Sequence, residues 1–289
     1  DNPTFLNARM RNLEDGSDVL IHEGDVSPIF IGAVSEDESA IVLLRQFANT
    51  YITAFVKVGD ETYDLTPNPQ KVHVVFNPVF TDNQTIYFTT DYESDYEYLA
   101  KFDLDTKQFS RVLEIENESI EDLTWDKEHQ AFYITTTKGV TDVLYHYDIN
   151  SEKLEKMSIP VDTIDQLHVA KSGNLYLLGT RATQPENIYK MTSDQEWEQF
   201  TENRVLGVAE EEMVDPEIVS YKSFDGMEIE ALLFRAKPEY DNGHTIFWPH
   251  GGPQAAERKF FRSMFQCFLN RGYTIFAPNF RGSTGYGSE

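Results

Sequence analysis

Short apolar runs recur along most of the chain at a regular distance. Four of them, at residues 40–43, 86–88, 132–134 and 175–177, follow one another at intervals of about 45 residues. Each is followed by a second apolar segment, such as 54–58 or 98–102, and Asp- and Asn-rich turns separate that segment from a third. A repeat of this length that holds about four short antiparallel strands is typical of a β-propeller blade.

The repeat extends over residues 1–213, which we expect to form an all-β propeller. Ahead of the four units, residues 8–13 and 18–21 resemble the last hairpin of another blade. Because a propeller hides its strand edges by closing its ring, the missing opening strands predict a propeller that is incomplete at its N-terminal end. A sandwich of unrelated strands is the alternative, but it does not explain the regular period.

The pattern changes after the acidic run 210–212, and residues 214–289 predict the start of an α/β domain. Residues 218–221 and 227–234 indicate a hairpin, and 244–248 and 273–277 are short apolar runs typical of buried strands. Between the last two, residues 255–270 predict a helix with one apolar face, made of Phe260, Phe261, Met264, Phe265, Phe268 and Leu269. A strand, a crossover helix and a second strand in this order predict a parallel strand pair.

The composition of the chain excludes several classes of binding partner. The chain has 289 residues, 40% of them hydrophobic, enough for one large or two ordinary domains. Its formal net charge of −25 repels phosphate groups, so we expect neither nucleic acid nor a membrane as partner. The single cysteine, Cys267, excludes an internal disulfide and a cysteine metal site and fits a cytoplasmic protein. The histidines are scattered along the predicted strands, so no metal site is expected.

Candidate catalytic residues lie in the loop His250-Gly251-Gly252-Pro253, which directly follows a predicted strand. Glycine has no side chain, so a backbone N–H in such a loop can approach a substrate oxygen closely. The comparable loop of α/β-hydrolases places an N–H against the oxyanion that forms during acyl transfer. The alternative is a tight turn with a buried histidine.

A second loop, Asn279 to Gly287, also follows a predicted strand. Taken with the propeller repeat, the two loops resemble the prolyl oligopeptidase family of serine peptidases, most closely its acylaminoacyl-peptidase branch. The resemblance implies a propeller that caps an α/β-hydrolase domain, a short-peptide substrate and no cofactor. It also implies that the Gly252 N–H belongs to the oxyanion hole. The remaining residues that it assigns to substrate-site loops are His250, Gly251, Pro253, Arg281, Gly282 and Tyr286.

The family's nucleophile has no counterpart in the sequence. Its mechanism uses a serine on a G-x-S-x-G turn, with an aspartate and a histidine later in the chain. No G-x-S-x-G occurs here, Ser283 lies in a loop of different spacing, and His250 precedes the position of such a turn. We therefore expect a serine peptidase that hydrolyses short or acylated peptides through an acyl-enzyme. This chain would carry only its propeller cap and oxyanion loop and would be inactive by itself.

Two other functions stay open at this point. The chain could be a non-catalytic propeller module that binds peptides or partner proteins. An esterase or lipase could use the same oxyanion loop, although a propeller cap matches these enzymes poorly. A partial α/β sheet leaves an apolar face uncovered, so we expect either further sequence to cover it or copies of the chain to associate as a homo-oligomer.

Overall fold

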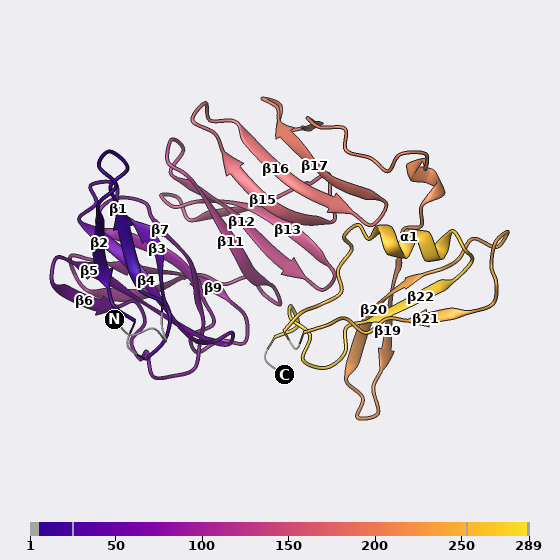
Figure 1. Ribbon diagram of the computed structural model, residues 1–289, viewed down its shortest axis with the longest axis horizontal. Coiled ribbons are helices and arrows are strands. Elements are labelled where there is room, and N and C mark those ends of the chain that lie inside the picture. The colour runs from indigo at the N-terminus through magenta and orange to yellow at the C-terminus, as the bar shows by residue number, and fades with distance from the viewer. Residues whose placement is uncertain (1–5, 25, 253, 288–289) are drawn as a thin grey trace. The chain divides into compact units, whose positions relative to one another are not determined.

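The computed structural model describes residues 6–24, 26–252 and 254–287, and strands account for most of its regular structure (Figure 1). The chain divides into two compact units. The first holds residues up to 116 together with 120–127, and the second holds residues 117–119 and those from 128 onward. No helix within the described ranges is long and apolar enough to cross a membrane.

The first unit contains a two-stranded hairpin and two four-stranded antiparallel sheets. The hairpin consists of β1 (Ala8–Arg11) and β2 (Asp18–His22). In both sheets each strand pairs with the next one along the chain. The strands are β3 (Ile29–Val34), β4 (Ala40–Ala48), β5 (Tyr51–Val58) and β6 (Glu61–Asp64), then β7 (Val75–Phe80), β8 (Thr85–Thr90), β9 (Tyr98–Asp103) and β10 (Gln108–Leu113).

The recurring apolar runs form the second strand of each sheet. The first four residues of β4, Ala40 to Leu43, are all buried, and so are Ile86 to Phe88 in β8. Side chains alternate between the two faces of a strand, so a continuous buried run needs cover on both faces. This explains why the sequence shows short continuous apolar runs at these positions and not a strict alternation.

The next two sheets along the chain repeat the same strand order. They consist of β11 (Ser119–Asp126), β12 (Ala131–Lys138), β13 (Thr141–Asp148) and β14 (Lys153–Met157), then β15 (Thr163–Val169), β16 (Leu175–Arg181), β17 (Gln184–Met191) and β18 (Trp197–Gln199). Within the second unit, Leu144, Leu177 and Tyr189 share one buried cluster. Four such sheets in succession confirm the predicted repeat of four-stranded units.

The last sheet has a different topology. A short 3-10 turn, η1 (Glu210–Glu212), precedes β19 (Glu217–Lys222), β20 (Glu228–Phe234), β21 (Thr245–Phe247), helix α1 (Ser263–Leu269) and β22 (Thr274–Pro278). The strand order is β19-β20-β22-β21. Strands β21 and β22 run parallel, with Ile246 opposite Ile275. The predicted parallel pair with its crossover helix is therefore present.

The helix is shorter than the sequence predicts, because residues 255–262 are not helical. Backbone donors of this segment bind partners elsewhere in the chain. The Lys259 N–H donates to Val140 O (2.9 Å), and the Phe261 N–H donates to Thr180 Oγ1 (3.2 Å). Tertiary hydrogen bonds thus replace the first turns of the predicted helix. Of the predicted apolar face, Phe265 and Leu269 are buried, whereas Met264 is exposed.

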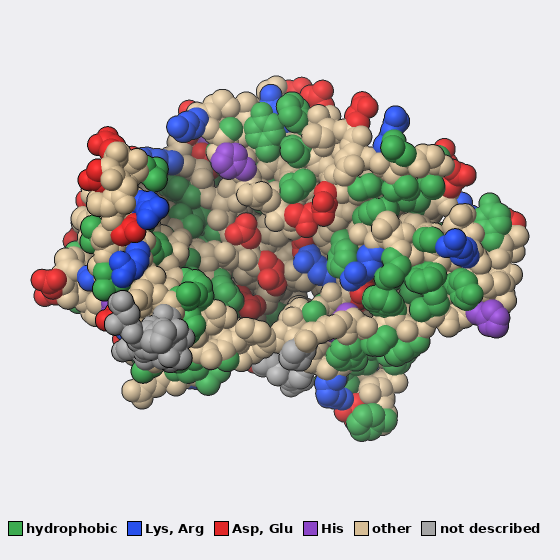
Figure 2. All heavy atoms as spheres, in the orientation of Figure 1, with side chains coloured by type: hydrophobic (Ala, Val, Ile, Leu, Met, Phe, Trp, Pro, Cys, Tyr) green, Lys and Arg blue, Asp and Glu red, His purple; other side chains and the backbone are tan. Residues whose placement is uncertain are grey.

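Charged side chains lie on the surface in no single arrangement. On the face shown in Figure 2, acidic side chains are interspersed with basic and apolar ones. This mixture of signs is typical of an ordinary solvated surface.

Candidate functional site

Two loops meet at one edge of the last sheet. They follow β21 and β22, which are parallel neighbours, so both loops leave the carboxyl ends of their strands. This edge is where open α/β sheets bind ligands. The first loop carries His250, Gly251 and Gly252, and the second runs from Asn279 to Gly287.

His250 joins the two loops. It is 8% exposed, and its Nε2 lies 2.8 Å from the hydroxyl oxygen of Ser283. The imidazole also stacks on the ring of Phe280, with the ring centroids 4.3 Å apart and an interplanar angle of 15°. Its Nδ1 faces the Gly251 carbonyl oxygen at 2.7 Å. The side chain therefore orients the first loop against the second.

Ser283 serves this connection and is not placed as a nucleophile. It is buried, and its oxygen lies 2.6 Å from Phe280 O as well as 2.8 Å from His250 Nε2. The hydroxyl donates its one proton to Phe280 O. The group is therefore engaged within the protein.

The two glycines of the first loop are exposed. No acceptor for the Gly252 N–H lies among residues 6–24, 26–252 and 254–287. A β-carbon on Gly252 would lie 3.0 Å from Gln254 N, whereas one on Gly251 would meet nothing within 4 Å. The amide of Gly252 is thus left unbonded by the described residues. Pro253, the last residue of the predicted motif, lies outside them.

Tyr286 is a tether of the second loop. Its hydroxyl donates to Glu230 Oε1 (2.7 Å) and accepts from Asn279 Nδ2 (2.8 Å). Burial, followed by the hydrogen bond and charge of Glu230, raises the pKa of Tyr286. The phenol therefore stays protonated and holds the loop to β20.

Asn279 is the centre of this network, a role that sequence reasoning missed. Its Oδ1 accepts from Glu257 N (2.7 Å), and its Nδ2 donates to Glu257 O (3.0 Å). The Glu257 carboxylate is paired in turn with both Nε and an Nη of Arg262, at 2.8 and 3.1 Å. No local sequence pattern predicts these contacts, because Asn279 and Glu257 are 22 residues apart.

Arg281 and Gly282 lie on the outside of the second loop. Both are exposed, and the Arg281 guanidinium pairs with Asp225 in the β19–β20 turn. Backbone hydrogen bonding from Met227, with Arg281 as a smaller cause, lowers the pKa of Asp225. Arg281 thus links the loop to the neighbouring hairpin at the surface.

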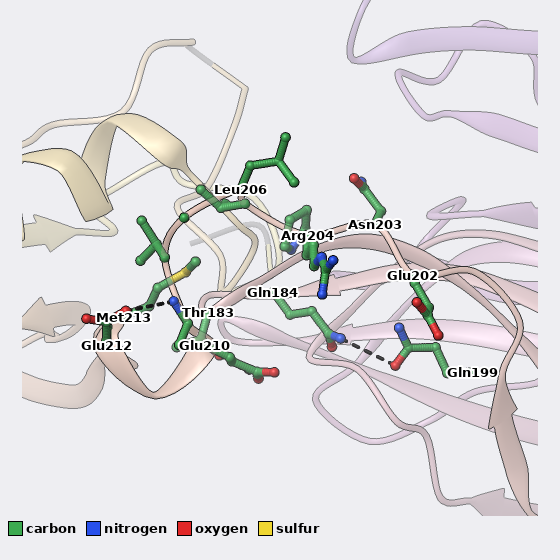
Figure 3. A pocket seen from close by; sticks show the side chains of 15 residues that line it. Thr183, Gln184, Gln199, Glu202, Asn203, Arg204, Leu206, Glu210, Glu212 and Met213 are labelled. Atoms are coloured by element: carbon green, nitrogen blue, oxygen red, sulfur yellow. Dashed lines mark hydrogen bonds between the residues drawn. The ribbon is translucent and has the colours of Figure 1, made fainter.

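Two cavities lie away from these loops. One of about 770 Å³ is lined by residues of β17, the end of β18 and the segment that leads to η1 (Figure 3). There Gln184 Nε2 donates to Gln199 Oε1 (3.5 Å). The other, of about 640 Å³, lies beside His146. Among the described residues no group of three or more His, Cys, Asp or Glu side chains could hold a metal ion.

Comparison with known proteins gives both sequence and structural relatives. No family model matches the chain. It is 30% identical over 176 residues to a Bacillus subtilis protein described as "Uncharacterized peptidase YuxL", which is 57% of this chain and 25% of that protein. A puromycin-hydrolyzing peptidase of Mycobacterium tuberculosis superposes with a TM-score of 0.80 at 15% identity, over 95% of this chain and 45% of that one. A prolyl endopeptidase structure gives 0.82 at 17% identity, over 97% and 42%.

The chain spans about a quarter of the length of its curated relative and less than half that of the solved structures. At these identities the structural likeness concerns the fold, and it extends over nearly the whole chain. The resemblance inferred from the blade repeat and the two loops is confirmed for the fold: over nearly its whole length the chain has the fold of solved peptidases of the prolyl oligopeptidase family, and part of its sequence is similar to that of a protein described as a peptidase.

Proposed function

We propose that this chain is the propeller cap and oxyanion loop of a serine peptidase that hydrolyses short or acylated peptides. In this proposal residues 1–213 form the cap and residues 214–289 begin an α/β-hydrolase domain. The observation that carries it is the N–H of the exposed residue Gly252, which has no acceptor among the described residues and lies at the carboxyl edge of a parallel strand pair. The relatives described as peptidases support it.

The proposed chemistry needs a donor where negative charge develops. Attack on a substrate carbonyl places that charge on the oxygen, and a backbone N–H within about 3 Å stabilises it. Removing one such donor typically costs about 3 kcal/mol in the transition state. The serine, aspartate and histidine of the triad would come from residues outside this sequence, because it contains no G-x-S-x-G. We therefore expect the 289-residue chain by itself to be inactive.

The second loop would border the substrate. Arg281 and Gly282 are exposed on it. His250 instead contacts Ser283, and Tyr286 contacts Glu230, so these two side chains hold the loops in place. In this arrangement Arg281 and Gly282 shape the site and take no part in bond cleavage. A cytoplasmic location follows from the single cysteine as part of the proposal.

Self-association is the remaining part of the proposal. Phe247 of β21 is 62% exposed on the outer strand of the last sheet. An exposed aromatic side chain on an edge strand favours contact with a further strand or a second copy. Sedimentation of the isolated chain tests this, and a monomer at all concentrations would contradict it.

The catalytic proposal is tested on the gene product extended beyond Glu289. We expect it to hydrolyse acyl-peptide or aminoacyl chromogenic substrates and to be blocked by a serine-directed phosphonate. Gly252→Pro removes the N–H and should lower kcat by about 10²–10³. Gly252→Ala keeps the N–H, although its methyl group would lie 3.0 Å from Gln254 N. Its kcat should therefore fall much less than that of Gly252→Pro.

Three outcomes would count against this proposal. Activity that resists the phosphonate would exclude a serine nucleophile, and equal activity of the two Gly252 variants would exclude the oxyanion role. Phosphonate-sensitive hydrolysis by the purified 289-residue chain would contradict the expected inactivity of the chain alone. An extended product that binds peptides without cleaving them would favour the non-catalytic module.

A further inference from the structure

The turn between β12 and β13 enters the apolar core of the last sheet. Val140, in this turn, is 1% exposed. It belongs to a cluster that also contains residues of β20, α1 and β22, namely Leu232, Phe234, Phe265, Leu269, Ile275 and Ala277. A blade hairpin thus supplies part of the packing behind the strands that carry the two loops.

The same hairpin binds the segment that follows the Gly251-Gly252 loop. Val140 O accepts from the Lys259 N–H (2.9 Å). The Asp142 side chain, 1% exposed, pairs with the Arg258 guanidinium. The Asp142 carboxylate also accepts from Ile164 N (2.7 Å), so the hairpin itself is held in place by β15.

Residues 254–262 have no regular structure, and contacts on two sides set their position. On one side are the Val140 and Asp142 contacts. On the other side Ala255 O accepts from Thr284 N (3.1 Å), and the Glu257 backbone bonds to the Asn279 side chain (2.7 and 3.0 Å). An irregular segment that is fixed by tertiary contacts shifts locally when one of them is lost.

We propose that Val140 and Asp142 are positioning residues that set the direction of the Gly252 N–H through Arg258 and Lys259. The proposal rests on the proposed function, since it assigns the hairpin a role in that site. Arg258 is only six residues beyond Gly252, and a displacement of about 1 Å in a catalytic group costs about 10²-fold in rate. The hairpin would therefore act on turnover and not on peptide binding.

Asp142→Asn is the test variant, and Glu118→Gln is its matched control. Glu118 is also a buried carboxylate of this blade, 3% exposed. It accepts from Thr136 Oγ1 (2.6 Å), Tyr145 OH (3.0 Å) and Lys138 Nζ (3.2 Å), all on β12 and β13. Both variants remove a buried carboxylate that contacts strands β12 and β13, but only the Asp142 variant breaks the pairing with Arg258.

The first measurement uses the 289-residue chain and needs no catalysis. The N–H groups of Glu257, Lys259 and Phe261 are hydrogen-bonded. Their hydrogen exchange should be about tenfold faster in Asp142→Asn and unchanged in Glu118→Gln, because losing a local contact raises exchange only in the segment it holds. Exchange of β20 and β22 reports overall stability in the same samples. Equal exchange of these three amides in the two variants would overturn the proposal.

The second measurement uses the extended, active protein. Asp142→Asn should lower kcat by about tenfold with KM within about twofold, whereas Glu118→Gln should leave both near the wild-type values. The losses of kcat in Asp142→Asn and Arg258→Gln should not be additive in the double variant, because the two side chains pair with each other. A wild type without peptidase activity would contradict the proposed function, while the exchange experiment would still decide the role of the hairpin. An active enzyme in which Asp142→Asn behaves like Glu118→Gln would overturn the hairpin's role alone.

Discussion

Gly272 follows helix α1, and we expect Gly272→Ala to be among the most damaging single-methyl changes in the chain. Its φ is +86°, and its N–H donates to Leu269 O (2.9 Å) to end the helix. A β-carbon at this position would lie 1.9 Å from Tyr240 O and 2.9 Å from Tyr240 C. These are backbone atoms, which cannot rotate away.

The expected loss has two parts. The left-handed conformation costs an L-residue about 1–2 kcal/mol. Relief of the clash requires the 240–242 segment to move by about 1 Å, which strains the bond from Asn242 N to Gly272 O (3.0 Å). Leaving the carbonyl of the buried residue Gly272 without this bond costs about 1–3 kcal/mol. Together these terms predict a decrease of about 2–5 kcal/mol in the free energy of unfolding.

Gly226→Ala is the control, because Gly226 has a φ of +90° but nothing within 4 Å of its β-carbon position. This variant should lose only the cost of the left-handed conformation, about 1–2 kcal/mol, from its free energy of unfolding. Urea denaturation followed by tryptophan fluorescence measures both variants, since Trp248 contacts Phe265 of α1 with ring centroids 5.3 Å apart. If Gly272→Ala loses no more stability than Gly226→Ala, the steric reasoning is wrong.

Three further changes test other parts of the structure by the same denaturation assay. Tyr286→Phe removes the hydroxyl between Asn279 and Glu230 and should cost about 1–3 kcal/mol; no loss would contradict the tether. Phe265→Ala removes a side chain that is only 2% exposed and should lower the free energy of unfolding by about 3–5 kcal/mol. A smaller loss would mean that neighbouring side chains move in to fill the cavity. Burial lowers the pKa of His73, so its contribution is complete above an ordinary histidine pKa of about 6.5 and is lost as pH falls through the folded value. The wild type should therefore lose more stability than His73→Gln between pH 8 and pH 5, and equal losses would refute this assignment.

Local patterns in the sequence were enough to predict most of the strands and the region of the two loops. The recurring apolar runs predicted the four-stranded sheets, since a strand buried on both faces must be continuously apolar. The strand, helix and strand between residues 244 and 277 predicted the parallel pair, whose carboxyl ends bring His250 and Asn279 to one edge. The glycines after the first strand marked the candidate oxyanion loop.

Only the tertiary structure decided how that loop is held. Asp142 and Arg258 are 116 residues apart, yet their pairing helps to fix the segment beyond Gly252. Val140 is an ordinary turn residue by sequence, yet its carbonyl oxygen and its buried side chain contact the same part of the structure. Val140 and Thr180 also shorten the predicted helix to Ser263–Leu269, because they accept from the backbone N–H groups of residues 259 and 261. Periodicity records which face of an element is apolar, whereas a hydrogen bond or an ion pair between distant segments leaves no repeating mark in either of them.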